Sequence, residues 1–170
     1  DIYADFKKKA IIKLKIKEDE LDKALSDRDL MEYLIDKFSE IIPGNEDSKK
    51  YQIFISGILE LLFYPDIAHP KIENEIHDGR KRIDITFENI SNSGFFNNLG
   101  TLYDIPCSLI IVECKNYSKD IANPELDQIS GRFSSRRGKF GLICCRGLDD
   151  EDLFEKREAD TFSDGRGLVF

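Results

Sequence analysis

The stretch SLIIVECK, residues 108–115, decides the fold of this 170-residue chain. Its apolar run at 109–112 is nearly continuous, which is typical of a central strand that is covered on both faces. Glu113 and Lys115 follow at its end, and the alternation of side chains along a strand places both on one face. Charged groups at the end of a buried strand need partners, so this strand is expected to hold either a polar site or an internal salt bridge.

Two further strands are predicted before it. Residues 71–76 and 82–90 alternate between apolar and polar side chains, and Asp-Gly at 78–79 is typical of a tight hairpin turn between them. In the second strand Ile83 and its alternate neighbours form the apolar face, whereas Asp84 lies on the polar face. We expect Asp84 to lie beside Glu113 and Lys115 on a neighbouring strand.

The first third of the chain is predicted to be mainly helical. Apolar residues at helical spacing predict a helix over 26–42 that ends before Pro43-Gly44, and the polar stretch 45–50 is interpreted as a linker. A second helix, apolar nearly all round, is expected from Tyr51 to Pro65. The alternation at 12–17 fits both a strand and a helix.

A crossover unit is predicted after the central strand. Asn123-Pro124 begins a helix expected over 124–137, and it is followed by a strand at 139–146. An acidic helix over 149–162 comes next, and then the opening of a last strand that the chain does not finish. This order predicts an α/β fold with a mixed central sheet flanked by helices, an antiparallel meander followed by a crossover.

The segment 91–106 is interpreted as a hairpin connection or a small lobe near the site. It contains Phe95, Phe96 and Tyr103. These rings either stack on nucleic-acid bases or pack over the sheet.

Composition indicates a globular protein of a reducing cytoplasm, with 41% hydrophobic and 34% charged residues. No apolar run approaches the roughly 20 residues of a membrane span, and no signal peptide is found, so no membrane partner is expected. The four cysteines lie in strand-like runs without zinc spacing, which predicts reduced, buried thiols. The net charge of −8 argues against nucleic acid, but segment 66–147 holds 11 basic and 11 acidic residues and is neutral.

Asp84, Glu113 and Lys115 form a set with defined chemistry. Two carboxylates beside an ammonium group are what a hard divalent cation and an activated water require. The alternative is a network of salt bridges between strands, which needs no metal.

The pattern Asp84…Glu113-Cys114-Lys115 resembles the D…(D/E)xK signature of the PD-(D/E)xK nuclease superfamily, which has the restriction-endonuclease-like fold. The resemblance covers residues 51–170 and implies an αβββαβ core there, with residues 1–50 as an N-terminal helical, partner-binding segment. Ile83 stands where the family's nominal Pro lies, and the long spacing between the two carboxylates implies an insertion at 91–106.

This resemblance implies a hydrolase that cleaves phosphodiester bonds with Mg²⁺ or Mn²⁺. Asp84, Glu113 and the backbone carbonyl of Cys114 would hold the metal, and Lys115 would position the attacking water. Glu60 would complete the metal site from the preceding helix, as in archaeal Holliday-junction resolvases; its alternative is an exposed helix face or a local ion pair.

Gln128 resembles the Gln that some members carry after the motif strand, where it touches the site or the substrate. Those members often have QxxxY, whereas Arg132 stands at the Tyr position here. Basic residues on both sides of the motif would bind the substrate backbone, or else form a solvated surface. They are Arg80, Lys81, Arg82, Arg132, Arg136, Arg137 and Lys139.

The expected substrate is DNA, with RNA as the other candidate, in restriction, phage defence, or repair and recombination. Cutting both strands together needs two sites, so we expect a homo-oligomer or a part of a larger multidomain protein. Two further hypotheses remain: an inactive nucleic-acid-binding module of the same fold, and a structural domain whose motif is a salt-bridge network.

Overall fold

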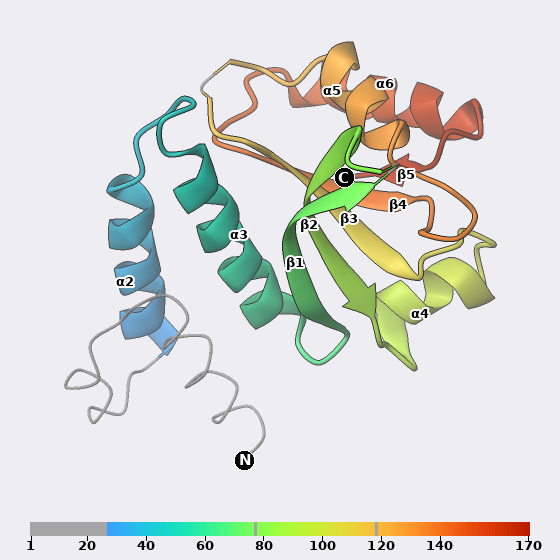
Figure 1. The fold of residues 1–170 in the computed structure, drawn as a ribbon, viewed down its shortest axis with the longest axis horizontal. Helices are drawn as coiled ribbons and strands as arrows, with labels where there is room; N and C mark the ends of the chain where they lie inside the picture. Colours follow the sequence, from blue (N-terminus) through green and yellow to red (C-terminus); the bar gives the residue numbers. More distant parts are fainter. Residues whose placement is uncertain (1–26, 77, 118) are drawn as a thin grey trace.

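The chain forms an α/β fold with a mixed five-stranded sheet (Figure 1). The computed structural model describes residues 27–76, 78–117 and 119–170, so the alternation at 12–17 lies outside the described residues. Within the described residues there are five helices and five strands. In chain order they are α2 (Asp27–Ser39), α3 (Ser48–Phe63), β1 (Ile67–Ile76), β2 (Lys81–Asn89), α4 (Gly94–Thr101), β3 (Leu109–Lys115), α5 (Asn123–Ser130), β4 (Phe140–Cys145), α6 (Glu151–Ser163) and β5 (Leu168–Val169).

The strands lie in the sheet in the order in which they occur in the chain. β1, β2 and β3 pair antiparallel, whereas β3, β4 and β5 pair parallel through crossovers that contain α5 and α6. The predicted meander and crossover are therefore confirmed. β1 is longer than predicted, since it begins at Ile67 and continues past a bulge between Ala68 and Lys71.

Helices cover both faces of the sheet. α3 and α4 pack on the face that contains Ile110 and Val112, and α5 and α6 pack on the face that contains Ile111. These three residues are completely buried, as the apolar run of β3 predicts for a central strand. In Figure 1, α2 and α3 lie side by side next to β1, and α5 and α6 lie together across the sheet.

The turn between β1 and β2 has the predicted chemistry. Asp78 and Gly79 both have positive φ, at 56° and 79°, the backbone conformation that Asp-Gly favours in hairpin turns, and they lie between Ile76 and Lys81, the last pair of the two strands. This turn places the basic start of β2 at one end of the sheet.

The stretch 45–50 is not a linker, because α3 begins within it at Ser48. The preceding helix ends at Ser39, earlier than predicted. The buried carboxylate of Asp47 closes the connection: it accepts a hydrogen bond from the Ile42 N–H at 3.0 Å and pairs with Lys50 at 2.6 Å. Local side-chain bonds of this kind favour a turn over continued helix.

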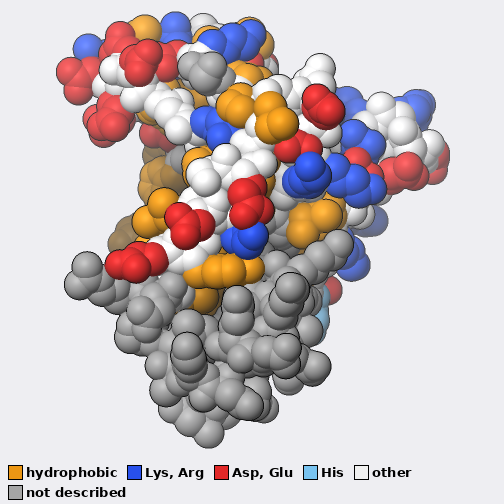
Figure 2. All heavy atoms as spheres, turned by 90° about the vertical axis from the view of Figure 1, so that its left-hand side faces the viewer, with side chains coloured by type: hydrophobic (Ala, Val, Ile, Leu, Met, Phe, Trp, Pro, Cys, Tyr) orange, Lys and Arg blue, Asp and Glu red, His pale blue; other side chains and the backbone are white. Residues whose placement is uncertain are grey.

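α2 packs against α3 through Leu30, Leu34, Tyr51 and Phe54. The outer face of α2 keeps hydrophobic side chains in solvent, since Met31 is 54% exposed. Figure 2 views this side of the molecule and shows hydrophobic side chains among acidic and basic ones.

α5 is shorter than the predicted helix 124–137 and ends at Ser130. The chain then turns, and Ser134 and Gly138 form a two-residue bridge. Gly138 has φ of 125° and lies so near the sheet that a Cβ would meet the Pro106 carbonyl oxygen at 2.9 Å. The chain must leave the helix to make this approach, so Arg136 and Arg137 lie in a loop rather than on a helix.

Segment 91–106 contains the helix α4, whereas the sequence analysis expected a hairpin connection or a small lobe without specifying a helix. The Asn89 amide donates to the carbonyl oxygens of Phe96 and Cys107, at 3.1 and 2.8 Å, and so fastens both ends of the segment. Phe96 is buried against the sheet, and the Phe95 ring lies 5.7 Å from that of Phe140. Phe96 packs over the sheet as the second alternative expects, whereas Phe95 is 46% exposed and Tyr103 is 59% exposed.

All four cysteines are free, as predicted. Cys107 is buried, whereas the other three are partly buried. Burial raises the pKa of Cys107 to about 11 and of Cys144 to about 12, so these thiols are protonated and unreactive at neutral pH. No helix in the described part of the chain is long and apolar enough to cross a bilayer.

Candidate functional site

The predicted carboxylates meet where β2 and β3 separate. The register between these strands runs from Glu88–Leu109 to Ile85–Val112. One residue further along β2, the Asp84 carboxylate accepts a hydrogen bond from the Cys114 N–H at 2.9 Å. A side chain of β2 thus bonds the main chain of β3, and this contact fixes the Asp84 carboxylate next to the Glu113–Lys115 segment.

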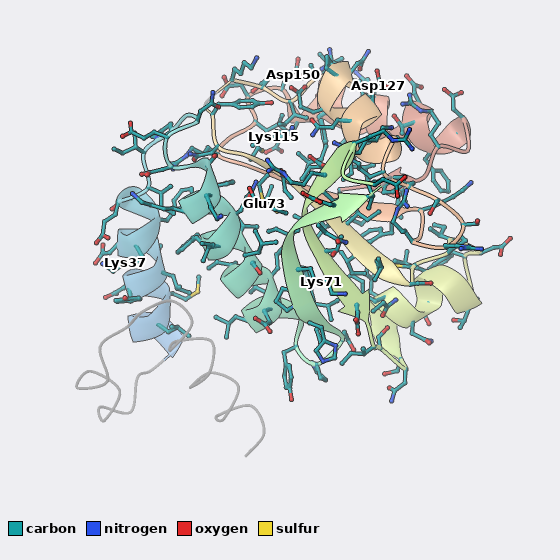
Figure 3. All side chains as sticks on the ribbon, in the orientation of Figure 1. Lys37, Lys71, Glu73, Lys115, Asp127 and Asp150 are labelled. Carbon is teal, nitrogen blue, oxygen red and sulfur yellow. The ribbon has the colours of Figure 1, made fainter. Side chains whose placement is uncertain are left out.

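Glu113, Gln128 and Lys115 form a continuous hydrogen-bonded chain. The Lys115 ammonium donates to Gln128 Oε1 at 2.7 Å, and Gln128 Nε2 donates to Glu113 Oε2 at 2.6 Å. β3 supplies the two charged residues on one face, and α5 lies over that face with Gln128 pointing back to it. Figure 3 shows Lys115 near the end of β3 and Asp127 on the nearby α5.

Arg132 completes the set from the turn after α5. Its Nε lies 3.4 Å from Glu113 Oε1, and its side chain is 14% exposed. The structure therefore brings together Asp84, Glu113, Lys115, Gln128 and Arg132, four of which the resemblance implied for the site. Arg132 was expected on the substrate, and it lies on a carboxylate instead.

Glu113 is completely buried, and this burial controls its charge. Desolvation, and after it the negative charge of Asp84, raise the pKa of the Glu113 carboxyl to about 7. The positive charges of Lys115 and Arg132 act in the opposite direction but do not offset the burial. Burying an ionised carboxylate is costly, and either protein partners or a bound cation can offset that cost.

The donor atoms suit Mg²⁺ or Mn²⁺. Asp84 and Glu113 offer carboxylate oxygens, and Cys114 lies between Glu113 and Lys115 with its backbone carbonyl as a further oxygen donor. In the described part of the chain, no group of three or more His, Cys, Asp or Glu side chains is arranged to hold a metal. Mg²⁺ needs only one or two carboxylates when waters and substrate phosphates supply its other ligands, so the pair fits this ion.

Glu60 is not brought into this set. It lies in α3, which packs on the Val112 face of the sheet, whereas Glu113 bonds to α5 on the other face. The charges that act on the Glu113 carboxyl come from Asp84, Lys115 and Arg132. A third carboxylate from this helix therefore stays a prediction.

The basic residues fall into two groups of different character. Lys81 and Arg82 are exposed at the start of β2, where Arg82 pairs with Glu73 at 3.2 Å. Arg80 is exposed in the turn and lies 3.8 Å from Asp78.

The second group lies in the loop after α5, where most of the basic side chains bond to other groups of the protein. Arg137 donates to the Arg132 carbonyl oxygen at 2.8 Å, and Lys139 donates to the Gly165 carbonyl oxygen at 3.1 Å. Arg136 is exposed.

Two residues next to the motif were missed by the sequence analysis. Asn116, directly after Lys115, donates to the carbonyl oxygens of Ile42 and Gly44 at 2.9 and 2.8 Å. Arg146, after β4, donates to Asn116 Oδ1 at 2.7 Å. Together these bonds hold the connection between α2 and α3 against the end of β3. The only sequence signal for either residue is that it is polar and directly follows a buried strand.

Comparisons of the chain with protein-family models, with curated proteins and with solved structures found no match. The site is therefore interpreted from its own residues.

Proposed function

We propose that this protein is a nuclease that hydrolyses phosphodiester bonds with the help of Mg²⁺ or Mn²⁺, and that its substrate is DNA. One observation is decisive for the proposal: Asp84 and the buried Glu113 lie together at the end of a central strand, beside Lys115. Such charges are costly inside a protein unless they are paired or coordinate a metal, and they gather more often at functional sites than elsewhere.

The arrangement of elements supports the same proposal. A helix, three antiparallel strands, a crossover helix and a parallel strand occur in the order implied by the resemblance to the PD-(D/E)xK superfamily. We infer a restriction-endonuclease-like core on this basis. The segment that contains α4 lies in the place of the implied insertion.

Each residue of the site has a role in this mechanism. A divalent cation at the carboxylates would lower the pKa of bound water and neutralise charge on the phosphate. Asp84 and Glu113 would hold the cation, with the Cys114 carbonyl as a third protein oxygen. Lys115 would orient the attacking water and stabilise negative charge that develops on the phosphate. Gln128 keeps the Lys115 ammonium and the Glu113 carboxylate in fixed positions, since it bonds both.

Exposed cations at the edge of the site would bind the substrate backbone. Arg80, Lys81 and Arg82 stand at the turn that leads into the Asp84 strand, and Arg136 is exposed beyond α5. Phosphate contacts of this kind give affinity that falls with salt and is independent of sequence. The acidic outer faces of α2 and α6 would point away from the nucleic acid.

The second candidate is an inactive nucleic-acid-binding module. One observation favours it: Glu113 is already bonded to Gln128 and Arg132, so the carboxylate has protein partners in the absence of a metal. An assignment to restriction, antiviral defence or repair, and assembly into an oligomer or a larger protein, are further parts of the proposal that cleavage assays on defined substrates would address.

A cleavage assay tests the proposal. Supercoiled plasmid, single-stranded DNA and RNA are incubated with the protein and Mn²⁺ or Mg²⁺, and products are followed over time. Asp84→Asn and Lys115→Met are expected to lower the rate by at least about a hundredfold, because each removes a group that acts on the metal or the water. Asp127→Asn is the matched control, since Asp127 is exposed on α5 beside Gln128 and pairs with Arg166.

Cleavage that is equal in the wild type and in Asp84→Asn would show that the activity comes from elsewhere. Binding of DNA by all variants, without metal-dependent cleavage by any, would favour the binding module.

A further inference from the structure

The two oxygens of the Glu113 carboxylate have different partners. Oε2 accepts a short hydrogen bond of 2.6 Å from the Gln128 amide, and Oε1 faces Arg132 Nε at 3.4 Å. The first contact is short and the second is at the long end of the range for hydrogen bonds. The two oxygens are therefore not equally available to a new ligand.

The hydrogen bond between Gln128 and Glu113 is fixed by Lys115, the other partner of the Gln128 amide. Lys115 donates to Gln128 Oε1, which forces the amide to present its nitrogen to Glu113. Ionised Lys115 has no acceptor to offer, so the orientation of the amide is unique. Glu113 Oε2 is thus held in place, and Oε1 is the oxygen that remains for a cation.

We propose that Arg132 is a placeholder for the divalent cation: its guanidinium occupies the Oε1 side of Glu113 in the metal-free protein and leaves when the cation binds. This inference rests on the proposed function and deepens it, because it assigns a regulatory contact to the same site. Metal binding would then include the breaking of one ion pair, and the affinity for metal would be lower than the carboxylate pair alone provides.

The surroundings of Arg132 allow this movement. The residue lies two positions after the end of α5, and its main chain is fixed by bonds from its N–H to the Ile129 carbonyl oxygen and from the Arg137 side chain to its own carbonyl oxygen. Its side chain is 14% exposed, whereas Glu113 is completely buried. The backbone therefore stays in place, and the guanidinium, which meets Glu113 through one long contact, can rotate toward solvent.

Calorimetric titration with Mn²⁺ at pH 8.5 tests the placeholder. Arg132→Met removes the competing cation and keeps most of the apolar stem, so Mn²⁺ is expected to bind about tenfold more tightly, the gain typical of losing one charge-assisted contact. The melting temperature in EDTA should fall, and the rise on adding Mn²⁺ should exceed that of the wild type. Lys156→Met, which replaces an exposed cation of α6, is the control and should change neither value.

A second measurement uses the wild-type protein and does not depend on the stability of a variant. The Nε–Hε resonance of Arg132 is followed by NMR during titration with Mg²⁺. It should shift as the contact with Glu113 breaks, and it should not shift in Asp84→Asn.

The outcomes separate the two proposals. Two results would overturn the placeholder and leave the proposed function intact. The first is Asp84-dependent binding of Mn²⁺ that is unchanged or weaker in Arg132→Met. The second is an Arg132 resonance that does not shift when Mg²⁺ is added. Absence of any Asp84-dependent cation binding would overturn the proposed function, and the placeholder with it.

Discussion

At the scale of single residues, Glu113 dominates the chemistry of the molecule. It is a fully buried carboxyl whose neighbours are another acid, an ammonium group, an amide and one guanidinium. Burial disfavours the charged form more than these partners favour it, so the pKa rises from 4.5 to about 7. The ionised form therefore costs stability in the absence of a metal.

A pH series measures this cost. Between pH 4.5 and about 7 the native protein keeps the Glu113 proton, whereas the unfolded chain has lost it. The native state then binds more protons, so the contribution to stability is complete below pH 4.5 and is lost as pH rises to about 7. The free energy of unfolding of the wild type, measured with urea, should fall by about 3 kcal/mol relative to Glu113→Gln over this window.

The comparison with Glu113→Gln isolates this group. Burial also raises the pKa of Glu158 to about 7, but Glu158 titrates in both proteins and cancels in the difference. Parallel stability curves for the two proteins would contradict the assignment of the raised pKa to Glu113.

At the scale of elements, the close approach of α5 to the sheet positions the site. Gly141 in β4 lies beneath this helix, and a Cβ at that position would meet Ile129 Cδ1 at 2.7 Å and the Ile111 carbonyl oxygen at 2.8 Å. The absence of a side chain lets α5 sit low on β3 and β4. Gln128, one residue before Ile129, can then reach both Glu113 and Lys115.

Gly141→Ala is expected to destabilise the protein by about 2 kcal/mol, because the backbone oxygen of the neighbouring strand cannot move away from the added methyl group. The displaced helix should also weaken Mn²⁺ binding. Denaturant unfolding and calorimetry check the two effects. Gly147→Ala is the control, since nothing lies within 4 Å of a Cβ there. Equal stability of the two variants would show that α5 can accommodate a methyl group at position 141.

At the scale of the whole molecule, one arginine joins α2 to the sheet. The Arg146 guanidinium lies 4.7 Å from the centre of the Phe38 ring and 5.6 Å from that of Tyr51. It donates to Asn116 and to the Ile41 carbonyl oxygen. The connection between α2 and α3 is thereby tied to the residue that follows Lys115.

Arg146→Met should cost about 3 kcal/mol of unfolding free energy, since it removes two cation–π contacts and leaves polar groups without partners. Hydrogen exchange at 40–47 should rise more than exchange in β3. The control is Arg166→Met, which breaks an exposed pair with Asp127 and should cost less than about 1 kcal/mol. Equal losses in the two variants would mean that α2 is held by its apolar contacts with α3 alone.

Strong local signals made most of the fold predictable. The apolar run of β3, the alternation in β2 and the Asp78-Gly79 turn each produced the predicted element. Predictions were wrong where polar residues decide the course of the chain. α3 begins inside the expected linker because the buried Asp47 closes the turn, and α5 ends early because Gly138 must pack on the sheet.

The sequence by itself determined that Glu113 and Lys115 share one face of a central strand, because that follows from the alternation of a strand and from the apolar run before it. The strand pattern also indicated that Asp84 could join them, and the resemblance to the nuclease superfamily implied the same of Gln128. The tertiary structure decided which partners each group has: it set Arg132 on Glu113 and tied Asn116 to the α2–α3 connection. These contacts depend on where helices and loops cross the sheet, and sequence spacing holds no information about such crossings.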